Sequence, residues 1–268
     1  MHDSPPAKPD YFKGEDSQSE ALKSIQEMLR TAASSQPPFP PTLLYNEGWL
    51  LRLVLNWFAG HSLQDHPLSF AAGATWFSEA LLPSAFLARR QGDPLAESWT
   101  HADGVIGQFQ IGKRGKGDLS LKPGSSQFLV LEAKMFSTLS PGVTHASYYD
   151  QAARSVACMA EVLRRADRHP SNISTLGFYV LAPSSQIEKG IFSKVMTKES
   201  ILKKVKRRVE AYEGAKDFWF EEWFQSVWDS VIVGCLSWEG LIAAVQGKDP
   251  PTGKDFEAFY KCCQQCGS

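Results

Sequence analysis

One segment of the chain, residues 127–136 with the sequence QFLVLEAKMF, constrains the fold more than any other. Its nearly continuous apolar residues predict a buried β-strand, and the turn-forming run PGSS precedes it. Two charged residues, Glu132 and Lys134, interrupt the apolar run near its end. Because side chains alternate between the two faces of a strand, we expect Glu132 and Lys134 to point to the same side. A carboxylate and an amine placed together inside a buried strand indicate a chemical role.

The composition is that of a chain able to build one large hydrophobic core. It has 268 residues, of which 43% are hydrophobic, and a formal net charge of −1. This charge does not indicate a generally basic nucleic-acid-binding protein, although it permits a local basic patch. The five cysteines are unevenly spread, which argues against a secreted disulfide framework. The first residues lack the layout of a signal peptide and the most apolar early run is too short to span a bilayer, so we expect a cytoplasmic protein without a membrane partner.

The chain divides into two parts of different composition. Prolines are concentrated in residues 1–41, and a short helix is expected between them over 19–33. We expect residues 1–41 to form a flexible, proline-rich N-terminal arm. Residues 42–268 are expected to form a single domain.

The predicted elements of residues 42–268 mix helices and strands. Apolar residues at helical spacing predict a first helix over 43–58, and a second helix is expected over 70–90. Three strands joined by short turns follow and are expected to form an antiparallel meander. The elements expected from there on are strands within 98–112, 117–123 and 127–136, a helix over 148–166, a strand over 174–183, a lysine-rich helix over 187–212, and a final helix, strand and helix. This order favours an α/β fold, with α+β as the alternative, built on a mixed central sheet flanked by helices.

The expected meander brings a second carboxylate to the charged pair. Asp118 begins the strand in GDLSL, 14 residues before Glu132, and a hairpin between the two strands would place the two carboxylates side by side. Two carboxylates at a strand end form an oxygen-rich site for a hard cation such as Mg²⁺. Lys134 beside that cation would orient or deprotonate a water molecule. This combination of groups is suited to phosphodiester hydrolysis.

The run GDLSL, a turn and FLVLEAK resemble the PD-(D/E)XK nuclease superfamily. The resemblance implies a restriction-endonuclease-like α-β-β-β-α-β core over about residues 70–183. It does not explain residues 184–268, which are expected to form a C-terminal elaboration of extra helices and a strand. It implies that Asp118 and Glu132 bind the metal, that the Ala133 carbonyl is a further ligand, and that Lys134 is the family's lysine. Gly117, rather than proline, precedes Asp118, which departs from the family pattern.

The resemblance extends to residues on the predicted flanking helices. Glu79, expected on the helix before the sheet, would complete the metal site. Gln151, on the helix after the E-x-K strand, would match a glutamine of the family. Arg154 lies one helical turn further on and its guanidinium suits a substrate phosphate. Tyr148 or Tyr149 would add stacking or a hydroxyl group to the substrate site.

Several of these positions have a simpler interpretation. An isolated E-x-K is often a structural salt bridge, Asp118 can be a turn residue, and the polar helix residues can be solvated or locally paired. Asp103, in HADGVIG, competes with Asp118 for the metal and otherwise belongs to a turn with Gly104. Two histidines, His101 and His145, can approach a substrate, although a lone histidine is usually structural.

Three further patterns have a structural and a functional interpretation. The run ILKKVKRRVEAY, residues 201–212, has one apolar face, and its basic residues form either a solvated outer face or a contact with a phosphate backbone. Trp219, Trp223 and Trp228 are expected to be packing residues. KCCQQC near the end contains a C-x-x-C spacing without a second ligand pair, so a zinc site is not expected.

These observations predict a Mg²⁺- or Mn²⁺-dependent nuclease acting on DNA. Two alternatives remain open: a nuclease acting on RNA, and a non-catalytic nucleic-acid-binding or scaffold module that retains the nuclease fold. The complete set of two acids and a lysine argues against the module, because clustered carboxylates are unfavourable unless they serve a purpose.

Overall fold

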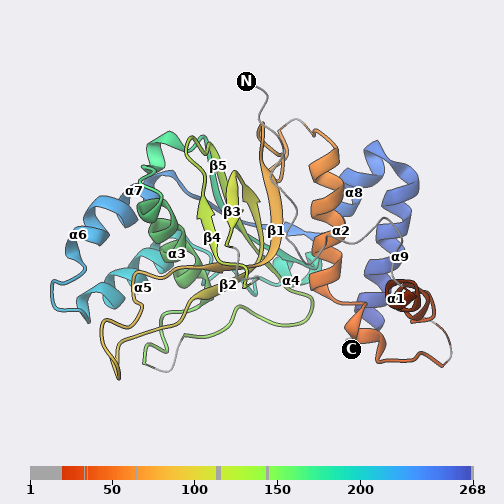
Figure 1. Cartoon of the computed structure of the whole chain (residues 1–268), viewed down its shortest axis with the longest axis horizontal. Helices are drawn as coiled ribbons and strands as arrows, with labels where there is room; N and C mark the ends of the chain where they lie inside the picture. The colour runs from red at the N-terminus through yellow and green to blue at the C-terminus, as the bar shows by residue number, and fades with distance from the viewer. Residues whose placement is uncertain are drawn as a thin grey trace. The chain divides into compact units, whose positions relative to one another are not determined.

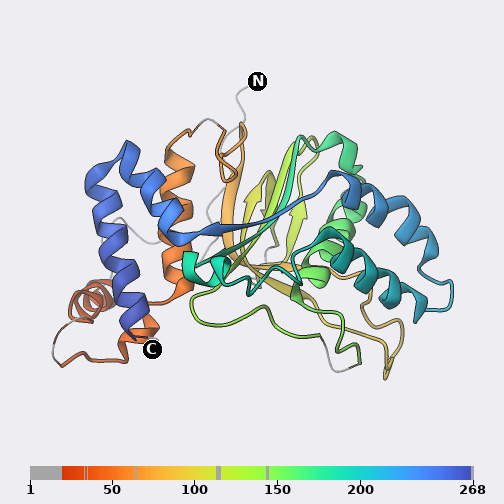
Figure 2. The same ribbon diagram turned by 180° about the vertical axis from the view of Figure 1, so that it is seen from behind.

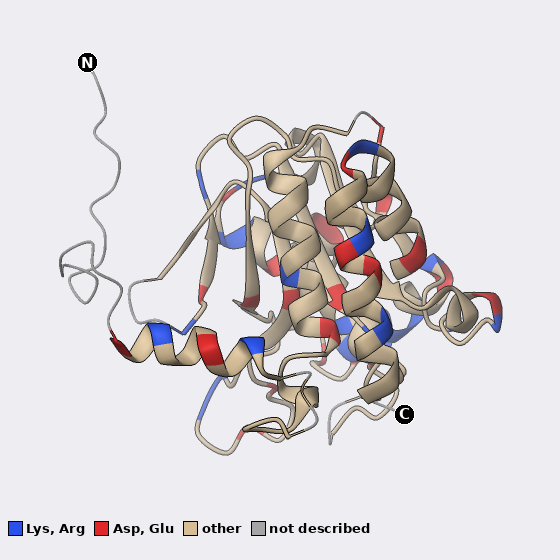
Figure 3. Cartoon of the chain, turned by 90° about the vertical axis from the view of Figure 1, so that its right-hand side faces the viewer, with Lys and Arg blue, Asp and Glu red and all other residues tan. Residues whose placement is uncertain are grey.

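The computed structural model describes residues 20–32, 34, 36–63, 65–112, 116–142 and 145–266. It separates into two compact units, residues 1–44 and 45–268. The expected arm over 1–41 belongs to the first unit, and its residues 1–19 lie outside the described part. In this unit, α1 (Glu20–Arg30) confirms the short helix, and a 3₁₀ turn, η2 (Pro41–Leu43), follows it. Acidic and basic residues alternate along α1 and form ion pairs at i, i+3 spacing (Figure 3).

A mixed five-stranded sheet forms the centre of the second unit (Figure 1). The strands are ordered β1-β2-β5-β6-β7, with the first two pairings antiparallel and the last two parallel. A separate hairpin pairs β3 with β4. The strands are β1 (Thr75–Leu82), β2 (Thr100–Gly107), β3 (Phe109–Ile111), β4 (Leu119–Leu121), β5 (Gln127–Ala133), β6 (Thr175–Ala182) and β7 (Ile232–Ser237).

Helices cover both faces of the sheet. Figures 1 and 2 show α2, α8 and α9 on one face and α3, α5, α6 and α7 on the other. The helical segments of this unit are α2 (Glu47–Gly60), α3 (Gln151–Arg165), η3 (Pro170–Asn172), α4 (Ser184–Glu188), α5 (Lys198–Glu210), α6 (Asp217–Trp219), η4 (Phe220–Phe224), α7 (Gln225–Ser230), α8 (Trp238–Lys248) and α9 (Pro250–Cys266). Because both faces are covered, every residue of β5 is buried, which accounts for its continuous apolar sequence.

The coarse prediction of an α/β fold with a mixed sheet between helices is confirmed. The helices and strands predicted over 43–58, 127–136, 148–166 and 174–183 are present as α2, β5, α3 and β6. The final helix, strand and helix are also present, as the segments from α6 to α9 with β7 between them. None of the helices in the described ranges is both long enough and apolar enough to cross a bilayer.

Three element predictions are wrong. Residues 70–90 form β1 and part of a loop instead of a helix, because pairing with β2 outweighs a weak helical pattern. The antiparallel meander is interrupted, since β4 pairs with β3 and β5 pairs with β2 and β6. The lysine-rich helix is divided into α4 and α5, and Gly190 adopts a left-handed conformation (φ +70°) just after α4.

Candidate active site

The strands β2 and β5 separate where three charged residues meet. Their regular pairing ends at Gly104 opposite Leu131. Just beyond this point, the backbone N–H of Ala133 donates a hydrogen bond to Asp103 Oδ2, with an N–O distance of 2.7 Å. A carboxylate thus replaces the backbone acceptor of the ladder and holds the two strand ends together. This bond places Asp103 beside Glu132.

The carboxylate of Glu132 is fully buried under the start of α3. Gln151 Nε2 donates to its Oε2 at 2.6 Å and Ser155 Oγ donates to its Oε1 at 3.2 Å. Gln151 and Ser155 are four residues apart and therefore share a face of α3. The backbone N–H of Ser140 donates to Gln151 Oε1 at 3.0 Å, which fixes the orientation of the amide. The prediction that Gln151 supports the E-x-K site is consistent with this contact.

Lys134 completes the group. Its Nζ lies 3.7 Å from Asp103 Oδ2 and 3.7 Å from Glu132 Oε2, and only 11% of the side chain is exposed. The backbone around it is fixed, because its N–H donates to the carbonyl of Leu181 at 2.8 Å and its carbonyl accepts from Trp238 Nε1 at 2.9 Å. The expectation that Glu132 and Lys134 face the same side of the strand is confirmed.

The electrostatics of the group are dominated by its two carboxylates. Burial raises the pKa of Glu132 well above its ordinary value, and the neighbouring charge of Asp103 raises it further. Lys134 opposes this rise. With both carboxylates ionised, the single amine between them would leave an excess of negative charge, and the raised pKa of Glu132 reflects this cost. A cation bound there would relieve the repulsion.

A cavity of about 290 Å³ opens beside Asp103. Its lining residues are Glu97, Ser98, Trp99, Thr100, His101, Asp103, Gln151 and Arg154. The Nε of Arg154 is buried and has no hydrogen-bond partner within the described part of the chain. The cavity therefore combines a carboxylate of the charged group with a guanidinium that can bind an anion.

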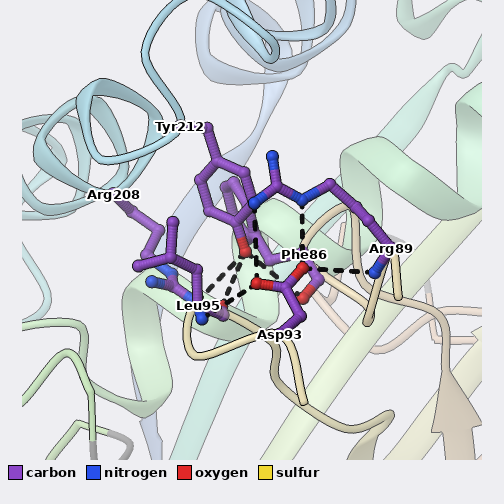
Figure 4. Close-up of polar contacts among 6 residues, drawn as sticks. All are labelled: Phe86, Arg89, Asp93, Leu95, Arg208 and Tyr212. Atoms are coloured by element: carbon purple, nitrogen blue, oxygen red, sulfur yellow. Dashed lines mark hydrogen bonds and ion pairs between the residues drawn. The ribbon is translucent and has the colours of Figure 1, made fainter. Parts of the chain in front are cut away.

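The loop before β2, which supplies much of this lining, is held in place from α5 (Figure 4). Tyr212, just beyond α5, donates from its hydroxyl to the carbonyl of Leu95 at 2.6 Å, and the guanidinium of Arg208 donates to the same carbonyl. Within the loop, Arg89 Nε donates to Asp93 Oδ2 at 3.0 Å, and this bond holds the pKa of Asp93 well below its ordinary value. Residues that line the cavity are thus fixed by a helix distant in sequence.

Asp118 does not join Glu132, contrary to the prediction. Its carboxylate packs against Gly112, where a Cβ atom would lie 1.9 Å from Oδ2. Asp118 lines a cavity with Val162, Arg165 and Ala166 at the C-terminal end of α3, whereas Glu132 contacts Gln151 and Ser155 in its first turns. The reason for the error is that β2 occupies the place beside β5 that the prediction gave to β4.

Glu79 lies on β1 instead of a helix, and its side chain turns away from the charged group. It has a left-handed backbone (φ +58°) in the stretch of β1 opposite Asp103. The strand changes face at this residue, since Trp76 packs on the α2 side of the sheet and Ala80 on the α3 side. The carboxylate of Glu79 pairs with Arg52 of α2 at 3.5 Å and is 55% exposed. The prediction that Glu79 completes the metal site is not supported by this geometry.

Tyr149 is also misplaced by the prediction. Its ring is fully buried and packs edge-on against Phe86, so the side chain does not face a substrate. Burial raises the pKa of its hydroxyl well above the ordinary value. The alternative, Tyr148, is partly exposed, and its ring stacks under Arg207 at 3.8 Å. Arg154, in contrast, lines the cavity as expected.

Asp103 and Ser155 are two site residues that the sequence prediction does not bring together with Glu132. The strand of Asp103, THADGVIG, has eight residues and β4 has three, so the longer strand offers more surface for pairing with the buried β5. Ser155 carries a detectable signal, because it lies one helical turn after Gln151. His101 lines the cavity, and His145 is exposed. Trp219 is buried, as expected of a packing residue.

Comparison of the chain with models of known protein families, with curated proteins and with solved structures finds no match. The geometry of the site is therefore the basis for assigning a function.

Proposed function

We propose that the chain is a Mg²⁺- or Mn²⁺-dependent nuclease that hydrolyses the phosphodiester bonds of DNA. The observation that carries the proposal is the convergence of Asp103, Glu132 and Lys134 at the point where β2 and β5 separate. This arrangement resembles the PD-(D/E)XK superfamily, with Asp103 instead of Asp118 as the first acid. With β3 and β4 as an inserted hairpin, the order α2-β1-β2-β5-α3-β6 also corresponds to that family's α-β-β-β-α-β core.

The donor set fits a hard divalent cation. Asp103 and Glu132 supply two carboxylates, and Mg²⁺ commonly uses one or two carboxylates with water molecules. The carbonyl of Ala133 points to the same edge of β5 as its N–H, which is bonded to Asp103. Among the described residues, no cluster of three or more His, Cys, Asp or Glu side chains is arranged around a common point, so the remaining ligands would be this carbonyl and water. When bound, such a cation would neutralise phosphate charge and lower the pKa of a bound water.

The side chains around this site have distinct roles in the proposal. Lys134, as an ammonium, orients the attacking water by hydrogen bonding and stabilises the negative charge that develops during attack. Gln151 and Ser155 hold the carboxylate of Glu132 in one orientation. Arg154 binds an oxygen of the substrate phosphate from the wall of the cavity.

The basic helix α5 supports binding of a nucleic-acid backbone. Lys204 Nζ pairs with Asp150 Oδ2 at 2.5 Å, and Asp150 caps the N-terminus of α3 next to Gln151. This contact places α5 against the end of α3 that forms the site. The exposed side chains of Lys203, Lys206 and Arg207 can then contact phosphates on either side of the cleavage position.

The test is cleavage of DNA by the purified protein with Mg²⁺, compared with Lys134→Ala. We expect Lys134→Ala to lower the cleavage rate by about 10²–10⁴-fold, because the group that positions the water is lost. Lys122→Ala is the control for loss of one positive charge, because Lys122 is exposed and lies outside the cavity, and it should cut at the wild-type rate. Equal rates for Lys134→Ala and wild type would contradict the proposal. Competition between labelled DNA and labelled RNA would decide which of the two nucleic acids is the substrate.

A further inference from the structure

A second cavity, of about 480 Å³, adjoins the candidate active site. Its lining residues are Leu81, Ser98, Trp99, His101, Lys116 and Asp118. Ser98, Trp99 and His101 also line the cavity beside Asp103. The two cavities are therefore neighbours, and a substrate phosphate at the charged group would carry its adjoining nucleotide towards the second one. The volume lies in the range of small-ligand pockets.

The groups in this second cavity match the surfaces of a nucleobase. Trp99 is partly buried and its ring is fixed by the guanidinium of Arg165, 5.5 Å from the ring centre. An indole held in this way offers a face for stacking. Asp118 lines the cavity. Its Oδ1 is buried and has no hydrogen-bond partner in the described ranges, so this oxygen can accept a hydrogen bond from a base when the side chain turns towards the cavity. Lys116 is exposed and contributes a donor at the mouth.

We propose that this cavity binds one unstacked nucleobase beside the scissile phosphate, so that the substrate is single-stranded DNA or an unpaired strand end. This inference rests on the proposed function. A base inside a duplex has both faces covered by its neighbours, and only a base outside the stack can pack against Trp99. Asp118 accepts a hydrogen bond from the exocyclic amino group of cytosine, adenine or guanine, and thymine has no such group. The only ring donor of thymine, N3–H, lies between two carbonyl oxygens that a carboxylate repels, so the site binds amino-bearing bases in preference to thymine.

The experiment measures binding of labelled oligonucleotides by fluorescence anisotropy in EDTA, where cleavage does not interfere. The probes are oligo-dC, oligo-dT, an abasic strand of equal length and a blunt duplex. We expect oligo-dC to bind most tightly and Trp99→Ala to weaken its affinity by about tenfold or more. Trp99→Phe keeps a stacking face and should recover most of that affinity. Asp118→Ala, which leaves no side-chain acceptor, should remove the preference of oligo-dC over oligo-dT.

Trp49→Ala is the matched control, because Trp49 is an exposed tryptophan on α2. This helix covers one face of the sheet, whereas Trp99 contacts Arg165 of α3, which covers the other face. Trp49→Ala should bind every probe as the wild type does. Tighter binding of the duplex, equal affinity of Trp99→Ala and wild type, or no binding of any strand would overturn the base site. Cleavage with Mg²⁺ in those cases would leave the nuclease proposal standing. Trp99-dependent binding without any cleavage would support the base site and reject the nuclease.

Discussion

At the scale of one residue, the buried carboxylate of Glu132 serves the proposed site but is electrostatically unfavourable for the folded chain. Its carboxylate is fully buried, and Asp103 lies beside it. Hydrogen bonds from Gln151 and Ser155 satisfy its oxygens but do not neutralise its charge. Burial therefore raises its pKa, and without a cation the folded chain keeps a proton that the unfolded chain releases.

This difference predicts the pH dependence of stability in EDTA. The contribution of Glu132 to the free energy of unfolding should fall as the pH rises above about 4.5, the ordinary pKa of a glutamate, because the folded state then holds a proton on Glu132 that the unfolded state has released. Glu132→Gln should remove this decline and raise stability at neutral pH by about 1 kcal/mol. Urea unfolding at a series of pH values measures both effects.

Glu161 is the control for this prediction, because it lies on α3, the helix that covers Glu132, and is also buried. Burial favours its neutral form, but hydrogen bonds from Arg164 and Arg165 outweigh burial and lower its pKa. The contribution of Glu161 to stability is present above its unfolded pKa and lost as the pH falls. Glu161→Gln should therefore destabilise the chain at neutral pH. A gain in stability for Glu161→Gln, or a loss for Glu132→Gln, would contradict the electrostatic account.

At the scale of elements, the loop before β2 depends on α5 for its conformation. It follows β1 and carries Trp99 and other residues of the cavity wall. The carbonyl of Leu95 accepts hydrogen bonds from both Tyr212 and Arg208 (Figure 4). These two bonds tie the loop to α5 in addition to the loop's own short-range contacts, such as the Arg89–Asp93 ion pair. We call these hydrogen bonds from Tyr212 and Arg208 to the Leu95 carbonyl the α5–loop junction. A substitution that breaks this junction should change the position of the residues that line the cavity.

Tyr212→Phe tests this junction by removing one hydroxyl. We expect a loss of about 1 kcal/mol in the free energy of unfolding, because the partner carbonyl loses a buried hydrogen bond. Tyr148→Phe removes a hydroxyl whose bond to the Arg207 carbonyl is longer, at 3.3 Å, and partly exposed. It should change stability by less than about 0.5 kcal/mol. Equal losses in the two variants, measured by denaturant unfolding, would show that the loop is not anchored in this way.

At the scale of the whole molecule, the sequence predicts elements better than it predicts their neighbours. The apolar run of β5 and the helical spacing of α3 identify these elements from local pattern alone. Local pattern does not state which strand lies beside β5. Residues 70–90 were misassigned for the same reason, because the conformation of β1 depends on its pairing with β2.

The choice between Asp103 and Asp118 illustrates this limit. Asp118 lies 14 residues before Glu132, whereas Asp103 lies 29 residues before Glu132. The hairpin with β4 is therefore the shorter connection. Doubling a loop's length adds only about 0.6 kcal/mol to the cost of closing it. The three-residue β4 offers little surface, whereas β2 has eight residues and pairs buried side chains such as Val105 with β5. Burial of this apolar surface outweighs the difference in loop length.

Titration of Mg²⁺ into the protein by calorimetry, with Asp103→Asn and Asp118→Asn, tests the central claim most directly. The amide oxygen of Asp103→Asn can still accept the hydrogen bond from Ala133, so the strand ends should stay together. We predict that Asp103→Asn weakens Mg²⁺ binding by about tenfold or more, and that Asp118→Asn binds Mg²⁺ as the wild type does. Loss of binding in Asp118→Asn, with wild-type affinity in Asp103→Asn, would contradict the account.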